Sequence, residues 1–448
     1  MNHATYAAPA LNAAIRKTWR RLVPLMFAMY FIAFIDRVNV GFAKDAMAID
    51  IALSQSAFAL GAGIFFAAYA LFGIPANLLM NRWGAKRWLS ATTALWGALS
   101  ACTGLVTNEQ QFIVLRFLLG IAEAGFYPGI LLLASIYFPN KVRASVIGIF
   151  VLGVPAALTL GSPLSGALLE MHGVLGKPGW FWMFVLEGLP AVALGVFAFF
   201  YLDDSPQQAR FLTEEERAAL VAQLAAEQQQ TETSSVKAAM RSGKVWHLAL
   251  IYGALQIGVY GLMFFLPSQV ASLMGTHLGF KASLMGTHLG FKASLVAAIP
   301  WAFSALGVYF LPRFADRNTA RRLPIAVGCM IAAALGLVVS SYAGPLLAIV
   351  ALSCCAVSFL AVQPIFWTFP AQVLTGPALA AGIGFCTTLG AAFSFLAPLI
   401  RTEAEQRFHS PHAGPLVLAA FSLLCAALLW ALRNRRAEVS KQDAEIAG

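Results

Sequence analysis

Apolar stretches of about 20 residues recur along the whole chain, and short polar segments separate them. Each stretch is long enough to cross a hydrocarbon core of about 30 Å as an α-helix. We expect twelve of them, at roughly 22–42, 57–79, 89–106, 111–135, 146–170, 180–202, 245–268, 294–312, 323–341, 346–368, 382–400 and 414–432. The pattern predicts an all-α membrane protein with twelve transmembrane helices.

Composition agrees with this pattern. Of the 448 residues 59% are hydrophobic and 11% are charged, and the mean hydropathy is +0.74. Ordinary soluble domains carry about 25% charged residues, so composition excludes a soluble globular class. The first twenty residues are polar and basic, with no cleavage site after the first apolar run, which is therefore expected to remain as a span. The six cysteines all lie in apolar segments and are interpreted as small core residues.

The distribution of positive charge predicts the topology. Between the expected spans, 22 of the 30 Lys and Arg residues fall on the side of both chain ends and 6 fall on the other side. By the positive-inside rule, both termini are expected in the cytoplasm, with the chain crossing the cell's inner (plasma) membrane several times. The net charge of +10 is therefore read as a topology signal, and no nucleic-acid partner is expected.

One long polar segment divides the spans into six and six. It predicts an N-terminal half at 1–202, a cytoplasmic linker at 203–244 and a C-terminal half at 245–448. Thr213 and Glu216 form a capping-box pattern, which predicts a short helix running to about Ala226. The rest of the segment is interpreted as a solvated connector.

The two halves carry traces of an internal repeat. Asn77 to Arg87, after span 2, matches Pro312 to Arg322, after span 8, in its polar positions at an offset of 235, and the same offset carries Pro163 of span 5 onto Pro398 of span 11. Two parallel repeats of six spans predict such matches.

A tandem duplication interrupts this symmetry. Ser272 to Ala282 is repeated identically as Ser283 to Ala293 between spans 7 and 8. Doubling the length of a flexible loop adds only about 0.6 kcal/mol of closure entropy, so we interpret the duplication as a tolerated insertion. His277 and His288 lack carboxylate or thiolate neighbours, and no metal site is predicted there.

Three longer phrases resemble one known family. They are IDRVNVGFA at 35–43, RFLLGIAEAGFYPG at 116–129 and GWFWMFVLEG at 179–188. With twelve spans and a basic loop after span 2, they are similar to the anion:cation symporter family of the major facilitator superfamily, over nearly the whole chain.

The resemblance implies the major facilitator fold and proton-coupled uptake of a small organic acid anion by alternating access. The expected partners are that anion, protons and the lipid bilayer, and the expected state is a monomer without a cofactor, driven by a proton gradient. Arg82, Asp316 and Arg317 match the gating loops of the superfamily, although Asn77 and Asn81 replace the usual Gly and Asp of the first loop.

Ionisable residues at membrane depth are few and are expected only in the first half. They are Asp36, Arg37, Arg116, Glu123 and Glu187. No Asp, Glu, Lys or Arg occurs from Leu323 to Ile400, so the second half is expected to supply neutral contacts. Such residues are costly in a bilayer and usually mark a functional site.

The charges suggest a mechanism. Arg37 stays protonated and offers a bidentate fork, so it is the expected substrate-binding cation. Asp36 and Glu123 are the expected proton carriers, with Arg116 aiding proton release inward. Asp36 is expected to turn towards span 4, and Gly120, between Arg116 and Glu123 on one helix stripe, is expected to admit another backbone or a ligand. The alternative is a buried ion-pair lattice, Asp36 with Arg116 or Arg37 with Glu123, and Glu187 is interpreted as structural.

Neutral substrate contacts are expected from both halves. Gln363 and Trp367 lie one turn apart on span 10 and share a face. The other expected contacts are Thr387, Thr388, Tyr30 and Tyr69.

Two other functions compete with import. A drug or metabolite exporter of the same fold would favour an acidic cavity and would not need Arg37. A membrane-embedded enzyme would need a nucleophile and base or a metal cluster, and the sequence offers no recognisable pattern of either kind. Among substrates, the sequence leaves sugar acids, dicarboxylates and aromatic carboxylates open, while Thr387 and Trp367 favour a less hydroxylated acid.

Overall fold

The computed structural model of the protein describes residues 3–228, 242–275, 289–317, 319–370 and 376–446. These residues form helices and connecting turns, with no strand in the described ranges. Eleven helices of this part of the chain are long and apolar enough to cross a membrane. The all-α fold class predicted from the sequence is therefore confirmed.

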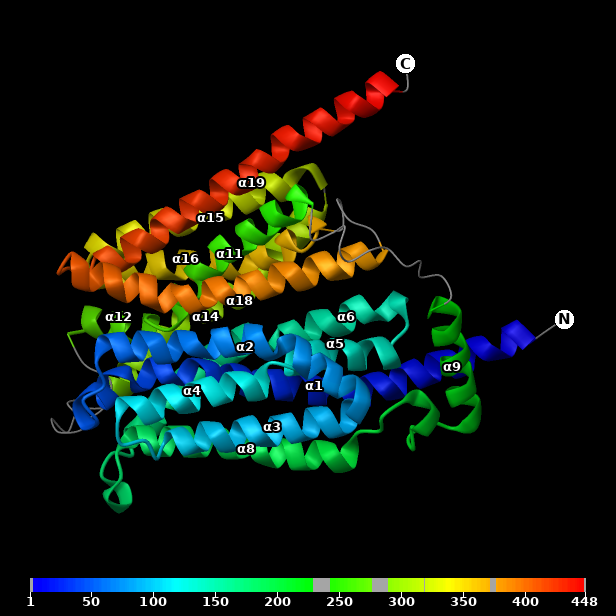
Figure 1. Ribbon diagram of the computed structural model, residues 1–448, viewed down its shortest axis with the longest axis horizontal. Coiled ribbons are helices and arrows are strands. Elements are labelled where there is room, and N and C mark those ends of the chain that lie inside the picture. The colour runs from blue at the N-terminus through cyan, green and yellow to red at the C-terminus, as the bar shows by residue number, and fades with distance from the viewer. Residues whose placement is uncertain (1–2, 229–241, 276–288, 318, 371–375, 447–448) are drawn as a thin grey trace.

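Helices α1 to α8 form a first group, drawn from blue to green in Figure 1. Their bounds are α1 His3–Asp50, α2 Gln55–Trp83, α3 Ala85–Thr103, α4 Glu109–Glu123, α5 Phe126–Tyr137, α6 Asn140–Val151, α7 Gly153–Leu169 and α8 Gly179–Tyr201. The 3-10 turn η1 (Val174–Gly176) precedes α8, and η2 (Pro206–Gln208) and α9 (Glu214–Gln228) follow it. The expected third span corresponds to α3, which is not one of these eleven candidate spans and packs along α8.

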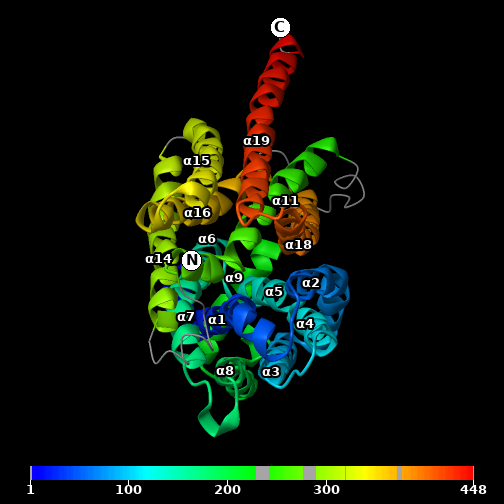
Figure 2. The ribbon, with the colours of Figure 1, turned by 90° about the vertical axis from the view of Figure 1, so that its left-hand side faces the viewer.

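The second group lies beside the first in both views (Figures 1 and 2). Its elements are α11 Gly243–Met263, α12 Leu266–Leu273, α14 Leu289–Asp316, η3 Thr319–Arg321, α15 Arg322–Tyr342, α16 Pro345–Phe366, α18 Gly376–Arg407 and α19 Ala413–Ile446. We call the groups the N-terminal half and the C-terminal half. The division of the chain at 202 and 244 stays a prediction.

Three of the expected spans are each broken into two helices. Span 4 divides into α4 and α5, span 5 into α6 and α7, and span 7 into α11 and α12. A proline stands within the first three residues of each second helix, at Pro128, Pro155 and Pro267. Proline has no backbone N–H and its ring clashes with the preceding turn, so it favours a helix start over an uninterrupted helix.

The two halves meet where α2 packs against α18 and α7 against α14. The contacts gather at the end of the molecule that carries Asp50, Gln55 and α12, which we call the distal end, opposite α9 (Figure 1). There the Ser56 hydroxyl and the Gln406 amide contact each other, with the Gln406 Nε2 donating to Ser56 Oγ over 3.1 Å.

Three glycines of the N-terminal half lie directly against the C-terminal half. A β-carbon at Gly41 would lie 2.6 Å from the carbonyl oxygen of Phe264, and one at Gly63 would lie 2.5 Å from that of Phe395. At Gly166, the side chain of Ser294 occupies the space that a β-carbon would need. The helices of the two halves therefore touch nearly backbone to backbone.

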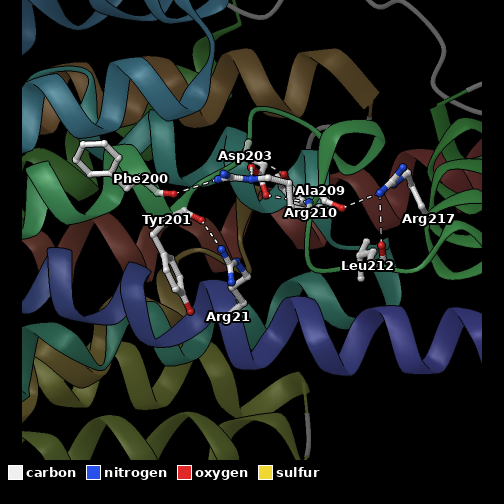
Figure 3. Close-up of polar contacts among 9 residues, drawn as sticks. Arg21, Phe200, Tyr201, Asp203, Ala209, Arg210, Leu212 and Arg217 are labelled. Carbon is white, nitrogen blue, oxygen red and sulfur yellow. Dashed lines mark hydrogen bonds and ion pairs between the residues drawn. The ribbon is translucent and has the colours of Figure 1, made fainter.

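The first part of the expected linker, up to the start of α9, is packed against the N-terminal half, while most of the stretch interpreted as a solvated connector lies outside the described residues. Figure 3 shows Arg21 of α1 donating from Nη2 to the Tyr201 carbonyl over 2.8 Å, and the same guanidinium stacks on the Phe211 ring at 4.9 Å. Arg210 donates from Nε to Asp203 over 2.8 Å and closes the turn.

The capping box predicted at the start of α9 is confirmed. The Thr213 N–H donates to Glu216 Oε2 over 2.9 Å, and the Glu216 N–H lies 3.4 Å from Thr213 Oγ1. Lys17 of α1 also donates from Nζ to Glu216 Oε2 over 2.8 Å, and this hydrogen bond holds the pKa of Glu216 below its usual range. The carboxylate therefore caps α9 and ties it to α1.

The interpretation of the six cysteines as core residues holds for four of them. Cys102 and Cys354 are exposed on the helix surface, where a small apolar side chain suits a lipid-facing position as well as a core, while the other four cysteines are buried as expected. His277 and His288 lie outside the described residues, as does most of the duplicated segment.

Candidate functional site

An ion pair is buried in the middle of the N-terminal half. Arg37 of α1 donates from Nη2 to Glu123 Oε2 at the end of α4, and the side chains are 9% and 0% exposed. Arg37 Nε and Glu123 Oε1 have no hydrogen-bond partner in the described structure. Of the two pairings left open by the sequence, the contact formed is Arg37 with Glu123.

Aromatic rings surround the guanidinium group of Arg37. Its Cζ atom lies 4.8 Å from the ring centre of Phe34, 5.1 Å from Phe65, 6.0 Å from Phe66 and 5.8 Å from Tyr69. Rings at these distances attract a cation through their negative faces. The charge of Arg37 is therefore stabilised in a low-dielectric place with few direct hydrogen bonds.

Arg116 lies near the pair of Arg37 and Glu123. Among the described contacts it has no hydrogen bond or ion pair with the carboxylate of Glu123 or of Asp36. Its Nε donates to the Gly61 carbonyl of α2 over 3.3 Å, and its Cζ lies 5.1 Å from the ring centre of Phe65. Phe65 thus packs against two cations. The backbone of Phe65 also fills the space at Gly120, so that glycine admits another helix and not a ligand.

Asp36 points away from Arg37, as adjacent helix positions must, but it does not turn towards span 4. Its Oδ1 accepts a hydrogen bond of 2.9 Å from Ser100 Oγ of α3, and its Oδ2 has no partner in the described structure. The expected direction is wrong because the sequence does not fix how far α1 is rotated about its axis.

Glu187 belongs to a second buried polar cluster. Its Oε1 accepts from Ser165 Oγ of α7 over 2.7 Å. Asn39 of α1 lies beside it, fully buried, with neither side-chain polar atom in good hydrogen-bond geometry. This cluster joins α1, α7 and α8.

The two tyrosines expected to contact substrate from the N-terminal half, Tyr30 and Tyr69, lie among the aromatic rings near Arg37. Tyr30 stacks on Phe150 with ring centres 4.1 Å apart and lies 6.0 Å from Tyr127. Tyr69 lies 6.1 Å from Phe65 and close to Arg37. Tyr30 also packs edge-on against Phe34, with ring centres 4.9 Å apart, and the Phe34 ring lies against the Arg37 guanidinium. Both tyrosines therefore belong to the aromatic surroundings of Arg37.

Helix α11 supplies residues that the sequence interpretation missed. Tyr252, Gln256 and Tyr260 recur every four positions and share one face. Tyr260 packs on Phe66 across the junction of the two halves, with ring centres 4.3 Å apart, and Gln256 Oε1 is buried without a partner in the described structure. The sequence signal that could have identified them is three side chains with polar ends, spaced four residues apart in an otherwise apolar helix.

The expected contacts of spans 10 and 11 fall close to this stripe only in part. Trp367, which follows α16, packs on Tyr252 at 4.8 Å between ring centres, and Gln363 is half-buried one turn before it. Thr387 is half-buried and donates its hydroxyl to the Gly384 carbonyl over 2.9 Å. Thr388 is exposed.

The expected gating residues lie apart from the Arg37 site, at helix ends towards α9. Arg82 closes α2 with an exposed side chain, and Arg317, just after α14, is exposed as well. The side chain of Asp316 lies outside what the structure describes.

One charged residue of the C-terminal half is buried just beyond the uncharged stretch from Leu323 to Ile400. Arg401 continues α18 one residue beyond the expected span end, and its side chain is 4% exposed. The predicted span ended at Ile400, where the apolar pattern stops, so Arg401 fell outside the expected spans. Among the described residues no group of three or more His, Cys, Asp and Glu side chains could hold a metal ion.

A sequence profile described as the Major Facilitator Superfamily matches residues 26–398. The chain belongs to this superfamily. It is a multi-pass membrane transporter, and the predicted fold is confirmed.

Curated relatives agree over almost the whole chain. The inner membrane transport protein RhmT of Escherichia coli strain K12 is 51% identical over 426 residues, covering 95% of this chain and 96% of its own. A protein of Agrobacterium vitis named for tartrate transport is 38% identical and covers 93% of this chain and 90% of its own. NicT of Pseudomonas putida, named for metabolite transport, is 33% identical with 93% of each covered. These relatives fit the organic acid transporters that the resemblance to the anion:cation symporter family implied.

Solved structures share the fold. A bacterial homologue of the human lysosomal transporter Spinster, in an inward-facing and unoccupied conformation, superposes with a TM-score of 0.71 at 18% identity, covering 91% of this chain and 95% of its own. The xylose transporter XylE of E. coli, in a partially occluded inward-open conformation, gives a TM-score of 0.67 at 17% identity, covering 92% and 96%.

Proposed function

We propose that this transporter imports a small organic acid anion together with protons, by alternating access between its two halves. The observation that carries the proposal is the buried pair of Arg37 and Glu123. A fixed cation at membrane depth binds a carboxylate well because little water competes for it. An exporter of cations or neutral drugs would have no use for that charge.

Glu123 is the proposed coupling group. While it is ionised it occupies Arg37, and protonation would weaken the pair and release the guanidinium for the substrate carboxylate. Proton binding and anion binding would thus favour each other, which is what symport requires. Asp36 is the second proposed proton carrier, and Arg116, stacked on the same Phe65 ring as Arg37, is proposed to favour proton release.

The C-terminal half is proposed to bind the rest of the substrate. In this proposal the substrate contacts are Tyr260, Gln256 and Tyr252 of α11 with Trp367, Gln363 and Thr387 from the C-terminal half, and Tyr30 and Tyr69 from the N-terminal half. The abundance of rings favours an acid with an apolar or unsaturated body. The relative named for tartrate transport keeps dicarboxylates among the candidates.

The distal end is proposed to face the outside of the inner membrane, with both termini, α9 and the gating residues Arg82, Asp316 and Arg317 on the cytoplasmic side. The clustering of basic residues on that side supports this orientation. The halves contact each other at the distal end, so the conformation described is proposed to be inward-facing.

Counterflow of labelled acids in proteoliposomes tests the proposal. A sugar acid, a dicarboxylate such as tartrate and an aromatic carboxylate should be compared, each with and without an imposed proton gradient. We expect one class to exchange without a gradient and to accumulate when the outside is acidified. Failure of all three anions to exchange would contradict the proposal.

The second candidate is export, because a quinolone resistance transporter of Acinetobacter baumannii is 34% identical over 390 residues. The same vesicles discriminate the two. Acceleration of uptake by internal acidification would indicate a proton antiporter working outwards.

A further inference from the structure

The ring of Phe265 is a meeting point of both halves at the distal end. It stands at the break between α11 and α12 and is 2% exposed. From the N-terminal half, Lys44 Nζ lies 4.6 Å from its centre and Phe58 packs edge-on at 5.7 Å. From the C-terminal half, the Cζ atom of Arg401 lies 4.3 Å from the same centre.

Arg401 holds the break itself in place. Its Nη1 donates to the Gly261 carbonyl of α11 over 2.8 Å, and its Nη2 lies 3.4 Å from Gln269 Oε1 of α12. Its Nε pairs with Glu405 at 3.1 Å, one turn along α18. The buried guanidinium therefore fixes α11, α12 and α18 relative to one another, and it presents a rigid flat cation to the ring.

Lys44 is the only cation from the opposite half that the described contacts bring to this ring. It also lies 5.4 Å from the Phe58 ring centre, so the ammonium group rests between two aromatic faces. The contact between Lys44 and Phe265 joins α1 to the α11–α12 break, next to the close approach of Gly41 and Phe264. Separation of the halves at this end must break it.

We infer that Phe265 is the distal gate residue of this transporter, held closed by Lys44 across the interface and positioned by Arg401. An aromatic ring suits this place because it attracts both cations at once and separates two like charges that would otherwise repel. Opening of the distal end removes Lys44 and Phe58 from the ring but leaves Arg401 and its partners on the same side. The gate thus moves with the C-terminal half.

The inference rests on alternating access and not on the identity of the substrate or the coupling ion. It can therefore be tested without any substrate, by the distance between the halves. Ser56 and Gln406 are exposed, lie in opposite halves and touch at the distal end. Nitroxide labels on Ser56→Cys and Gln406→Cys, in a background without the six native cysteines, report opening as a longer distance in pulsed electron paramagnetic resonance.

Phe265→Ala should move the distance distribution from the short population towards a longer one, with the ratio of open to closed molecules rising roughly tenfold. Lys44→Gln should give the same shift, and Lys44→Arg, which keeps a cation on the ring, should restore the short distance. Phe408→Ala, an exposed aromatic residue at the same end, serves as the matched control and should leave the distances unchanged.

A short distance retained in both Phe265→Ala and Lys44→Gln would overturn the inference, even if transport were impaired. The Lys44 variants keep the test decisive if Phe265→Ala folds poorly. A shift in Lys44→Gln that Lys44→Arg fails to reverse would also count against a gate held by charge.

Discussion

Arg37 and Glu123 form a buried pair in which neither partner uses all of its hydrogen-bonding capacity. Arg37 Nε and Glu123 Oε1 both lack partners in the described structure. A buried polar group left unpaired is unfavourable by about 1–3 kcal/mol, so such a pair favours a third participant. A proton on the carboxyl group or a second carboxylate at the guanidinium group would supply one.

Glu123→Gln removes the titratable group while keeping its shape. We expect uptake to lose its dependence on external pH, because the amide cannot take up the coupling proton, while exchange of bound anion across the membrane persists. Initial rates measured at a series of external pH values check this. Glu403→Gln, an exposed carboxylate on α18, is the matched control, and unchanged proton coupling in Glu123→Gln would contradict the assignment.

Arg37→Lys keeps the charge but loses the planar fork and its stacking on the rings. Hydrogen bonds to charged groups are worth about 1.5–3 kcal/mol, so the apparent affinity for the anion should fall by roughly 10- to 100-fold. Concentration dependence of counterflow measures it. Arg87→Lys, on an exposed turn of α3, should have no effect; equal affinity in the two variants would remove Arg37 from the site.

Gln256→Leu separates a binding role from a packing role. If the unpartnered Oε1 atom contacts substrate, the Michaelis constant should rise about tenfold, while thermal stability stays the same or increases because an unsatisfied polar atom has been removed. Uptake and unfolding temperature should be measured on the same preparation. A more stable protein with unaltered uptake would mean that Gln256 only fills space.

Gly120→Ala tests the close approach of α4 to α2. A methyl group would meet the backbone of Phe65, and overpacking of this kind is destabilising by about 1–3 kcal/mol. The unfolding temperature in detergent should fall by several degrees. Gly148→Ala on α6, where a β-carbon would meet nothing within 4 Å, is the control, and it should not lower the unfolding temperature.

Glu216→Gln probes the attachment of α9 to α1. The pKa of Glu216 is lowered in the folded protein by the hydrogen bond from Lys17, so its contribution to stability is present at neutral pH and is lost as pH falls through the folded pKa. The pair is partly exposed, so the variant should lose less than about 1 kcal/mol at neutral pH. That difference from the parent should shrink as the pH falls below the ordinary glutamate pKa of about 4.3, and it should vanish once the pH is below the lowered pKa of Glu216 in the folded protein. Unfolding curves at several pH values measure it, and a difference that persists in acid would contradict the ionic explanation.

Long apolar runs made the fold predictable, because a span can be read from the length of its hydrophobic segment alone. The same criterion missed the helix breaks, although Pro128, Pro155 and Pro267 marked them. It also missed Arg401, since the long, largely apolar arm of an arginine lets α18 continue inside the protein past the point where the hydropathy pattern ends.

The candidate site was predictable in its residue types and less so in its directions. Adjacency required Asp36 and Arg37 to diverge, but only packing decides that Asp36 meets Ser100 of α3. Tyr252, Gln256 and Tyr260 were passed over because their helix is apolar on nearly all sides, and which side faces the partner half depends on tertiary contacts. Sequence periodicity reports burial, and it does not report what lies across an interface.

The glycines at the distal end bear on the speed of the transport cycle. Three glycines, Gly41, Gly63 and Gly166, present no side chains to the opposite half. No side chain at these positions therefore has to change its rotamer before the two halves separate. The interface between the halves has backbone contacts at these glycines and one aromatic contact at Phe265. It can therefore separate and re-form many times without rearrangement of side chains. We expect larger side chains at these three positions to slow turnover because they hinder closure of the interface between the halves, even where they leave the substrate site unchanged.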